Sequence, residues 1–225
     1  MKKIKFEELV KVFKKYVDKD NKITQRGDVS LIYNDGEYLL GTNSHVALRV
    51  KLERVEGIPA DFTEGLQYCP FDNKVKNSGK YPNLNRLFDS ALMNAEHVSF
   101  WKKRVLNELY ECVKEDFRLI EKNSKLDERL IKLYIQEDYY EHRAIVKEKT
   151  INQTILKHRR ASFNSNKQYT LHVKFNYYKD AIMNCKKLQI EKDYDVEMHI
   201  AEHNRPILFK CDNIFDIMVL PTIIR

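Results

Sequence analysis

The pattern that most constrains this chain is a helical segment followed by a group of strands, which recurs three times along 225 residues. Apolar residues at helical spacing predict helices over residues 6–17, 100–121 and 177–187. Alternating or continuous apolar runs predict strands at residues 29–33, 38–41, 46–52, 130–136, 140–146, 151–156, 169–175, 195–200, 207–210 and 215–220. Each unit is β-α-β-β-β or close to it, so we expect an α+β fold with helices on one face of antiparallel sheets.

Two segments lack a clear period and are expected to be irregular connections. Residues 157–168 form the shorter one. Residues 53–95 form the longer one, which is unusually long for a loop inside a compact domain. We therefore expect short elements within it, around residues 66–71 and 83–93.

The bulk composition excludes several classes of protein. With 43% hydrophobic residues the chain can bury a core, and no apolar run of about 18 residues predicts a membrane span. The N-terminus has no apolar signal region, so a cytoplasmic protein is expected. The cysteines lie far apart and form no C-x-x-C pair, which favours free thiols over a metal site; they are Cys69, Cys112, Cys185 and Cys211. We expect no cofactor.

The positive charge is concentrated in one stretch. Residues 157–187 hold eight Lys and Arg and one acidic residue, a net charge of +7, which equals the formal net charge of the whole chain. Such a stretch is typical of a protein that binds a phosphate backbone. The alternative is a solvated face with no ligand.

The run of residues 212–225 is unusually apolar for a chain terminus, which is normally polar and frayed. We expect it to form a strand within a sheet, whose last residues offer an apolar edge to another molecule.

Four stretches resemble, in the same order, stretches of the bacterial DNA sliding clamps, the beta subunits of DNA polymerase III. Gly41-Thr-Asn-Ser-His-Val-Ala-Leu48 is similar to the clamp stretch Ala-Thr-Asp-Gly-His-Arg-Leu-Ala. Gly79-Lys-Tyr-Pro-Asn-Leu-Asn-Arg-Leu87 resembles Gly-x-Phe/Tyr-Pro-Asp-Tyr-x-Arg-Val. Phe175-Asn176 resembles the Phe-Asn start of a clamp helix, and Val219-Leu-Pro221 resembles the closing strand. The order matches the second and third clamp domains, and no stretch resembles the first.

The resemblance implies a DNA-clamp-like fold and a function without chemistry. A homo-oligomeric ring of this family encircles duplex DNA, without sequence preference, and tethers DNA polymerase or other replication proteins. The chain would have two clamp-like domains, residues 1–95 and 96–225, and a phage or mobile element is the expected source. Because clamp rings turn helices toward the central hole, helix lysines would contact phosphates. The candidates are Lys11, Lys14, Lys15, Lys102, Lys103, Lys179, Lys186 and Lys187.

The resemblance also implies a pocket for partner peptides between adjacent domains. Carried over by position, it would be formed by Thr42, His45, Val46, Ala47, Pro82, Arg86, Leu87, Met218, Val219, Leu220, Pro221 and Thr222. An apolar groove with a few polar anchors can bind an extended peptide. Ordinary hydrogen bonding at a strand end would equally explain Thr42 and His45.

Departures from the family leave two further hypotheses open. Val46 stands where the family has arginine and Ser44 where it has glycine, so the subunit number and the closure of a ring are open. The chain could instead be an interaction or adaptor protein with the clamp fold, or a nucleic-acid-processing enzyme with an unrecognised site. His199-Ile-Ala-Glu-His203 matches a zinc-peptidase pattern, but that pattern needs a helix and the stretch alternates like a strand.

Overall fold

The computed structural model describes residues 2–19, 29–77, 79–123, 129–135, 139–146, 149–157, 159–162, 168–191, 194–201 and 205–222. His203 of the zinc-like pattern lies outside these residues, and His199 lies in a strand, as the alternation of its stretch predicts.

Ten of the described strands form one antiparallel sheet, in the order β12-β8-β14-β15-β16-β4-β3-β2-β6-β7. Their bounds are β2 (Ile32–Asn34), β3 (Tyr38–Thr42), β4 (Val46–Lys51), β6 (Gln67–Cys69), β7 (Lys74–Lys76), β8 (His97–Trp101), β12 (Arg159–Ser162), β14 (Val196–Ile200), β15 (Ile207–Cys211) and β16 (Phe215–Val219). β16 pairs with β15 on one side and with β4 on the other. The apolar run near residue 220 is therefore a central strand, as expected.

A smaller antiparallel sheet has the order β11-β10-β9-β13. Its strands are β9 (Arg129–Ile135), β10 (Tyr139–Val146), β11 (Lys149–Lys157) and β13 (Tyr169–Lys174). The second and third β-α-β-β-β units exchange their first strands, because β8 joins β14–β16 and β13 joins β9–β11. Two short strands, β1 (Ile4–Lys5) and β5 (Val55–Glu56), pair in parallel beside a 3-10 turn at Leu52–Arg54.

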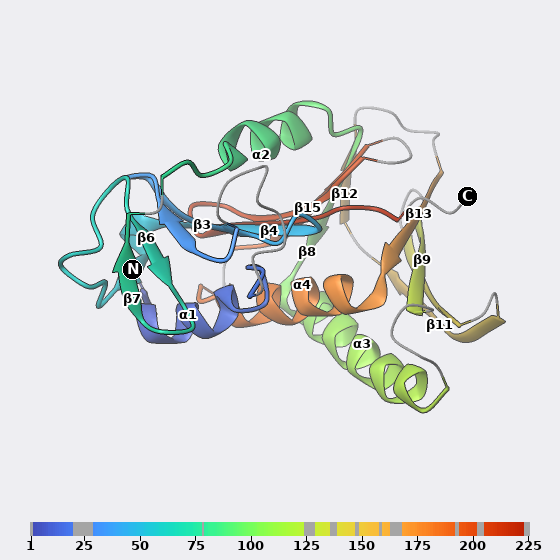
Figure 1. Cartoon of the computed structure of the whole chain (residues 1–225). Coiled ribbons are helices and arrows are strands. Elements are labelled where there is room, and N and C mark those ends of the chain that lie inside the picture. Colours follow the sequence, from blue (N-terminus) through green and yellow to red (C-terminus); the bar gives the residue numbers. More distant parts are fainter. Residues whose placement is uncertain are drawn as a thin grey trace.

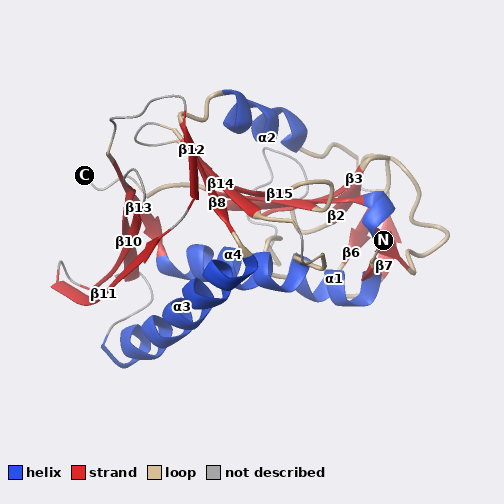
Figure 2. Cartoon of the chain, turned by 180° about the vertical axis from the view of Figure 1, so that it is seen from behind, coloured by secondary structure: helices blue, strands red, loops and turns tan. Residues whose placement is uncertain are grey.

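Three helices lie on one side of the large sheet and a fourth lies on the other (Figures 1 and 2). The three are α1 (Phe6–Phe13), α3 (Lys103–Asn123) and α4 (Phe175–Leu188), and the fourth is α2 (Leu84–Met93). The main core fills the space between the three helices and the sheet. Gly41 in β3 accommodates α1, because a Cβ at this position would lie 2.6 Å from Cδ1 of Phe13.

The opposite face of the sheet carries a second, smaller apolar cluster. Strand side chains alternate between the faces, so Leu48 and Ile217 enter the main core whereas Ala47 and Met218 face α2. The cluster consists of Leu40, Ala47, Leu84, Phe88, Leu208 and Met218. It explains why α2 packs on this face.

Most predicted elements are present, and two predictions are wrong. The helix predicted from residue 100 begins at Lys103, because residues 97–101 form β8. The connection predicted at residues 157–168 contains β12, which pairs with β8. The short elements expected within residues 53–95 are confirmed as β6 and α2.

One buried carboxyl group between α3 and β11 predicts a pH dependence of stability. Asp116 is 1% exposed and accepts a hydrogen bond from Asn152. Burial raises the pKa of Asp116 to about 6. Since this pKa exceeds that of the unfolded chain, the stability that Asp116 contributes is fully present below about pH 4 and is lost as the pH rises through 6.

We expect Asp116→Asn to remove this dependence and to raise the free energy of unfolding at pH 8 by roughly 2–3 kcal/mol. Urea unfolding between pH 4 and 8 measures it. Asp61→Asn makes the same charge change at an exposed position outside α3 and is the control. Equal pH profiles for wild type and Asp116→Asn would contradict the assignment.

Candidate functional site: an apolar pocket beside α2

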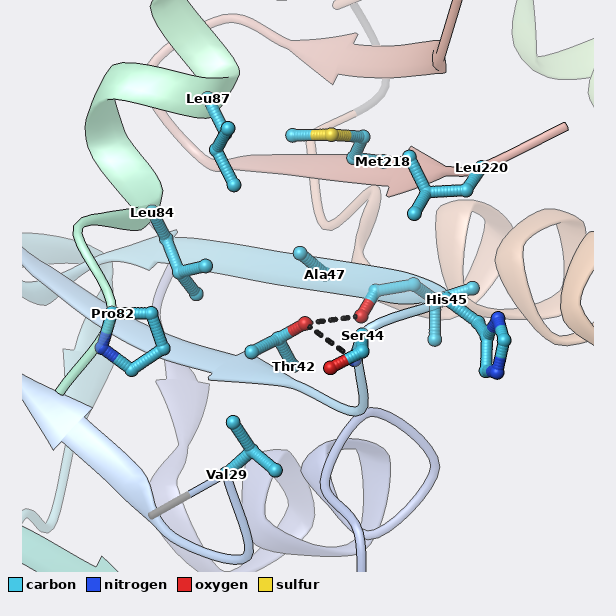
Figure 3. A pocket seen from close by; sticks show the side chains of 11 residues that line it. Val29, Thr42, Ser44, His45, Ala47, Pro82, Leu84, Leu87, Met218 and Leu220 are labelled. Atoms are coloured by element: carbon cyan, nitrogen blue, oxygen red, sulfur yellow. Dashed lines mark hydrogen bonds between the residues drawn. The ribbon is translucent and has the colours of Figure 1, made fainter. Parts of the chain in front are cut away.

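The sheet face that carries α2 has a pocket of about 140 Å³ beside the second apolar cluster (Figure 3). Its lining residues come from four separate parts of the chain, and they are Val29, Thr42, Ser44, His45, Val46, Ala47, Pro82, Leu84, Leu87, Met218 and Leu220. Ala47 and Met218 lie on adjacent strands, β4 and β16, and form the floor. Leu84 and Leu87 project from α2 and form one wall.

The turn between β3 and β4 fixes the polar rim of the pocket. The Thr42 hydroxyl donates to the Val46 carbonyl at 2.8 Å and accepts from the Ser44 amide at 3.1 Å. Ser44 has a φ of 70°, a left-handed conformation that explains why a clamp-like sequence would place glycine here. The strand-end hydrogen bonding that the sequence left open for Thr42 is therefore present, while its side chain also lines the pocket.

His45 connects the pocket with the helical side of the molecule. Its ring stacks on Tyr177 of α4, with 5.2 Å between the ring centroids. Burial, together with nearby Lys174, lowers the pKa of His45, so the imidazole is neutral at pH 7. The side chains contribute three polar groups to this rim: the neutral ring of His45 and the hydroxyl groups of Thr42 and Ser44.

The start of α2 decides which residues of that helix face the pocket. Asn83 caps the helix, because its side chain accepts a hydrogen bond from the Arg86 amide at 3.1 Å. Residues three and four apart share a helix face, so Leu84 and Leu87 line the pocket. Arg86 is instead exposed and lines a shallow surface depression with Asp89 and Met93.

The structure brings eight of the twelve sequence-predicted groove residues to this pocket: Thr42, His45, Val46, Ala47, Pro82, Leu87, Met218 and Leu220. Four others do not line it. Arg86 points to solvent, and Val219 is buried in the main core. Pro221 and Thr222 continue toward β13, where the Thr222 amide donates to the His172 carbonyl at 2.7 Å.

Three lining residues were missed by sequence reasoning. Leu84 could have been found, because it lies one helical turn from Leu87 and Phe88. Ser44 could have been inferred from its place in the turn. No local signal identifies Val29, which approaches the pocket from the segment before β2.

No protein-family model and no curated protein matches the sequence. Solved structures do match. The DNA polymerase III subunit beta from Pseudomonas aeruginosa has a TM-score of 0.67 at 12% identity, over 96% of this chain and 64% of that one. The sliding clamp from Bacillus subtilis has a TM-score of 0.67 at 13% identity, over 97% of this chain and 63% of that one. The DNA polymerase III subunit beta from Borrelia burgdorferi, solved in complex with a natural product, has a TM-score of 0.64 at 14% identity, over 99% of this chain and 62% of that one.

This chain has the bacterial sliding-clamp fold. The resemblance inferred from four short stretches is thereby confirmed, as is the expected α+β architecture of antiparallel sheets. The clamp fold here spans about 64% of the length of the clamps it matches. The expectation of helices on one face of the sheet does not hold for α2, which lies on the opposite face from the other helices.

The lysines proposed to contact DNA lie on or beside the three helices on one side of the clamp fold. Some of these lysines already contact carboxylates or aromatic rings of the protein itself. Lys15 lies 3.7 Å from Asp180, and Lys179 lies over the Phe117 ring. Lys186 lies over the Tyr110 ring and 3.9 Å from Glu111. Among the described residues, no ion pair involves the other candidates, Lys11, Lys14, Lys102, Lys103 and Lys187.

The described part of the chain contains no group of three or more His, Cys, Asp or Glu side chains placed to hold a metal ion. None of its helices is long and apolar enough to cross a membrane.

Proposed function

We propose that this protein is a sliding-clamp-like processivity factor that encircles duplex DNA and tethers a DNA polymerase or another replication protein through a peptide. The observation that carries the proposal is the apolar pocket on the outer face, opposite the helices α1, α3 and α4 (Figure 1). One face would meet DNA while the other stays free to hold a partner.

The pocket suits one large apolar side chain. A cavity of about 150 Å³ lined by aliphatic residues accepts a benzene-sized group, and this pocket has a volume of about 140 Å³. A Leu or Phe anchor of an extended peptide fits that volume. Micromolar affinity, about −8 kcal/mol, is expected for such modest burial.

We further propose that residues 1–95 and 96–225 are two clamp-like domains. Strand exchange between the units that begin at β8 and β13 supports the second of them, because neither unit has a complete sheet alone. The pairing of β4 with β16 joins the two parts into one sheet.

Encirclement requires several copies of this chain. Three β-α-β-β-β units cannot close a ring of twelve, the number that the family resemblance implies. The segment at residues 53–95 would offer a fourth unit only if its helix lay with the others, and α2 lies on the opposite face. We therefore expect four chains in the ring.

Mass measurement in solution tests this assembly. We expect a particle of four 26.9 kDa chains, with or without a primed circular DNA. A protein that stays monomeric at tens of micromolar, in the presence and absence of DNA, would refute encirclement. That result would favour the adaptor hypothesis.

A further inference from the structure

Arg49 is a charged side chain almost completely buried on the face of the sheet that carries α2. It lies in β4, two residues after Ala47 of the pocket floor, and it is 5% exposed. Burying an unpaired guanidinium would cost several kcal/mol. Its partners therefore indicate what the residue holds together.

The partners of Arg49 belong to the sheet and to α2. Nε donates to Asp216, directly opposite on β16, at 2.6 Å. Nη1 donates to Asp89 at 3.2 Å and to Asn85 at 3.4 Å, and both residues lie on α2. A single guanidinium therefore bridges the pocket floor strands to the helix that forms the pocket wall.

Two aromatic rings hold the guanidinium in place. The Arg49 Cζ lies 4.8 Å from the Tyr38 ring centroid and 4.7 Å from the Phe88 centroid. Tyr38 belongs to β3 and Phe88 to α2. A planar, delocalised cation suits this position between rings, and a lysine ammonium does not reproduce it.

The wall of the pocket depends on this bridge. Leu84 and Leu87 lie within one turn of Asn85, Phe88 and Asp89. Apolar contacts between α2 and the sheet have no directional preference, so they allow the helix to slide or to close onto the floor. Directional hydrogen bonds to a fixed guanidinium prevent both movements of the helix.

We propose that Arg49 is a positioning residue: it fixes α2 relative to β4 and β16, so that the apolar pocket stays open before a ligand arrives. The inference rests on the proposed function, since it assigns a role in binding the apolar anchor of a partner peptide. Pre-organisation of this kind raises affinity by removing an ordering cost.

The test compares Arg49→Met/Asp216→Asn with the wild type. The pair is changed together because Arg49→Met alone would leave the buried Asp216 without its partner. Lys51→Met is the matched control, since Lys51 also lies near the Tyr38 ring but bonds only to exposed Glu37 in the described structure. The probe is a fluorescent form of acetyl-Ser-Leu-Ser-Leu-Phe-Ser-amide.

We expect the folded double variant to bind the probe about tenfold more weakly, within the range of couplings between contacting residues. Lys51→Met should bind within about twofold of wild type. Asp89→Asn removes the carboxylate partner of Arg49 on α2 at an exposed position and should weaken binding in the same direction. Unchanged affinity in both Arg49→Met/Asp216→Asn and Asp89→Asn would overturn the proposal.

A second measurement separates this inference from the proposed function. Amide hydrogen exchange of residues 84–93 in the ligand-free protein should become faster in Arg49→Met/Asp216→Asn and stay unchanged in Lys51→Met. If wild type does not bind the probe, the peptide function fails, while exchange still reports whether Arg49 holds α2. Unchanged exchange in the double variant would refute the positioning role.

Discussion

Leu87→Asp with Leu220→Asp is expected to abolish binding of a Leu- and Phe-containing peptide and to leave the protein folded. The two side chains line opposite parts of the pocket and are 53% and 39% exposed, so a carboxylate at either position can reach water in the free protein. A bound apolar anchor would desolvate those carboxylates without pairing them. We expect a loss of affinity of a hundredfold or more, about 2.7 kcal/mol.

Fluorescence anisotropy with the labelled peptide measures the loss, and thermal unfolding confirms that the variant is folded. Met93→Asp is the matched control, because Met93 also lies on α2, is 88% exposed and does not line the pocket. Wild-type affinity in the Leu87/Leu220 variant would show that the peptide binds elsewhere. An equal loss in Met93→Asp would point to the outer surface of α2.

Reversal of Lys11, Lys14 and Lys187 to glutamate should weaken binding to duplex DNA by about a hundredfold at 0.1 M salt. Lys11 and Lys14 lie on or next to α1, Lys187 lies on α4, and all three are exposed on the helical side. In the described structure none of them forms an ion pair, unlike Lys15 and Lys186. Phosphate contacts release counterions, so losing three should reduce the slope of log affinity against log salt by about 2.7.

A control for this variant carries the same charge change on the face with α2. Lys51→Glu, Lys80→Glu and Arg86→Glu together should leave the salt slope unchanged. Titration of end-blocked duplex at several salt concentrations gives both slopes. Equal losses in the two variants would indicate a general effect of net charge, and no loss in either would contradict the proposed DNA-facing side.

Local sequence signals predicted the elements whose partners are close along the chain. The hairpin between β2 and β3 is one example, because Gly36 has a φ of 92° and its amide donates to Asn34. β8 and β12 were missed because their partners lie far away in sequence, and the apolar residues of β8 run directly into α3. Periodicity identifies an element but does not identify a distant strand that pairs with it.

The pocket residues likewise divide into those that the sequence predicts and those that depend on the folded structure. Position in the clamp-like stretches indicated Ala47, Leu87 and Met218, which the fold brings together. The same argument placed Arg86 in the groove, but the phase of α2 turns it to solvent. Arg49 carried no signal, because its significance depends on partners in β16 and α2.

The central place of β16 constrains how the protein is made. β4 cannot acquire its neighbour on that side until residues 215–219 have been synthesised, some 165 residues after Val50. At a synthesis rate of about 5–20 residues per second, this edge of β4 stays unpaired for roughly ten to thirty seconds. An incomplete translation product that stops before β16 would display that apolar strand edge permanently, and such edges pair readily with other chains.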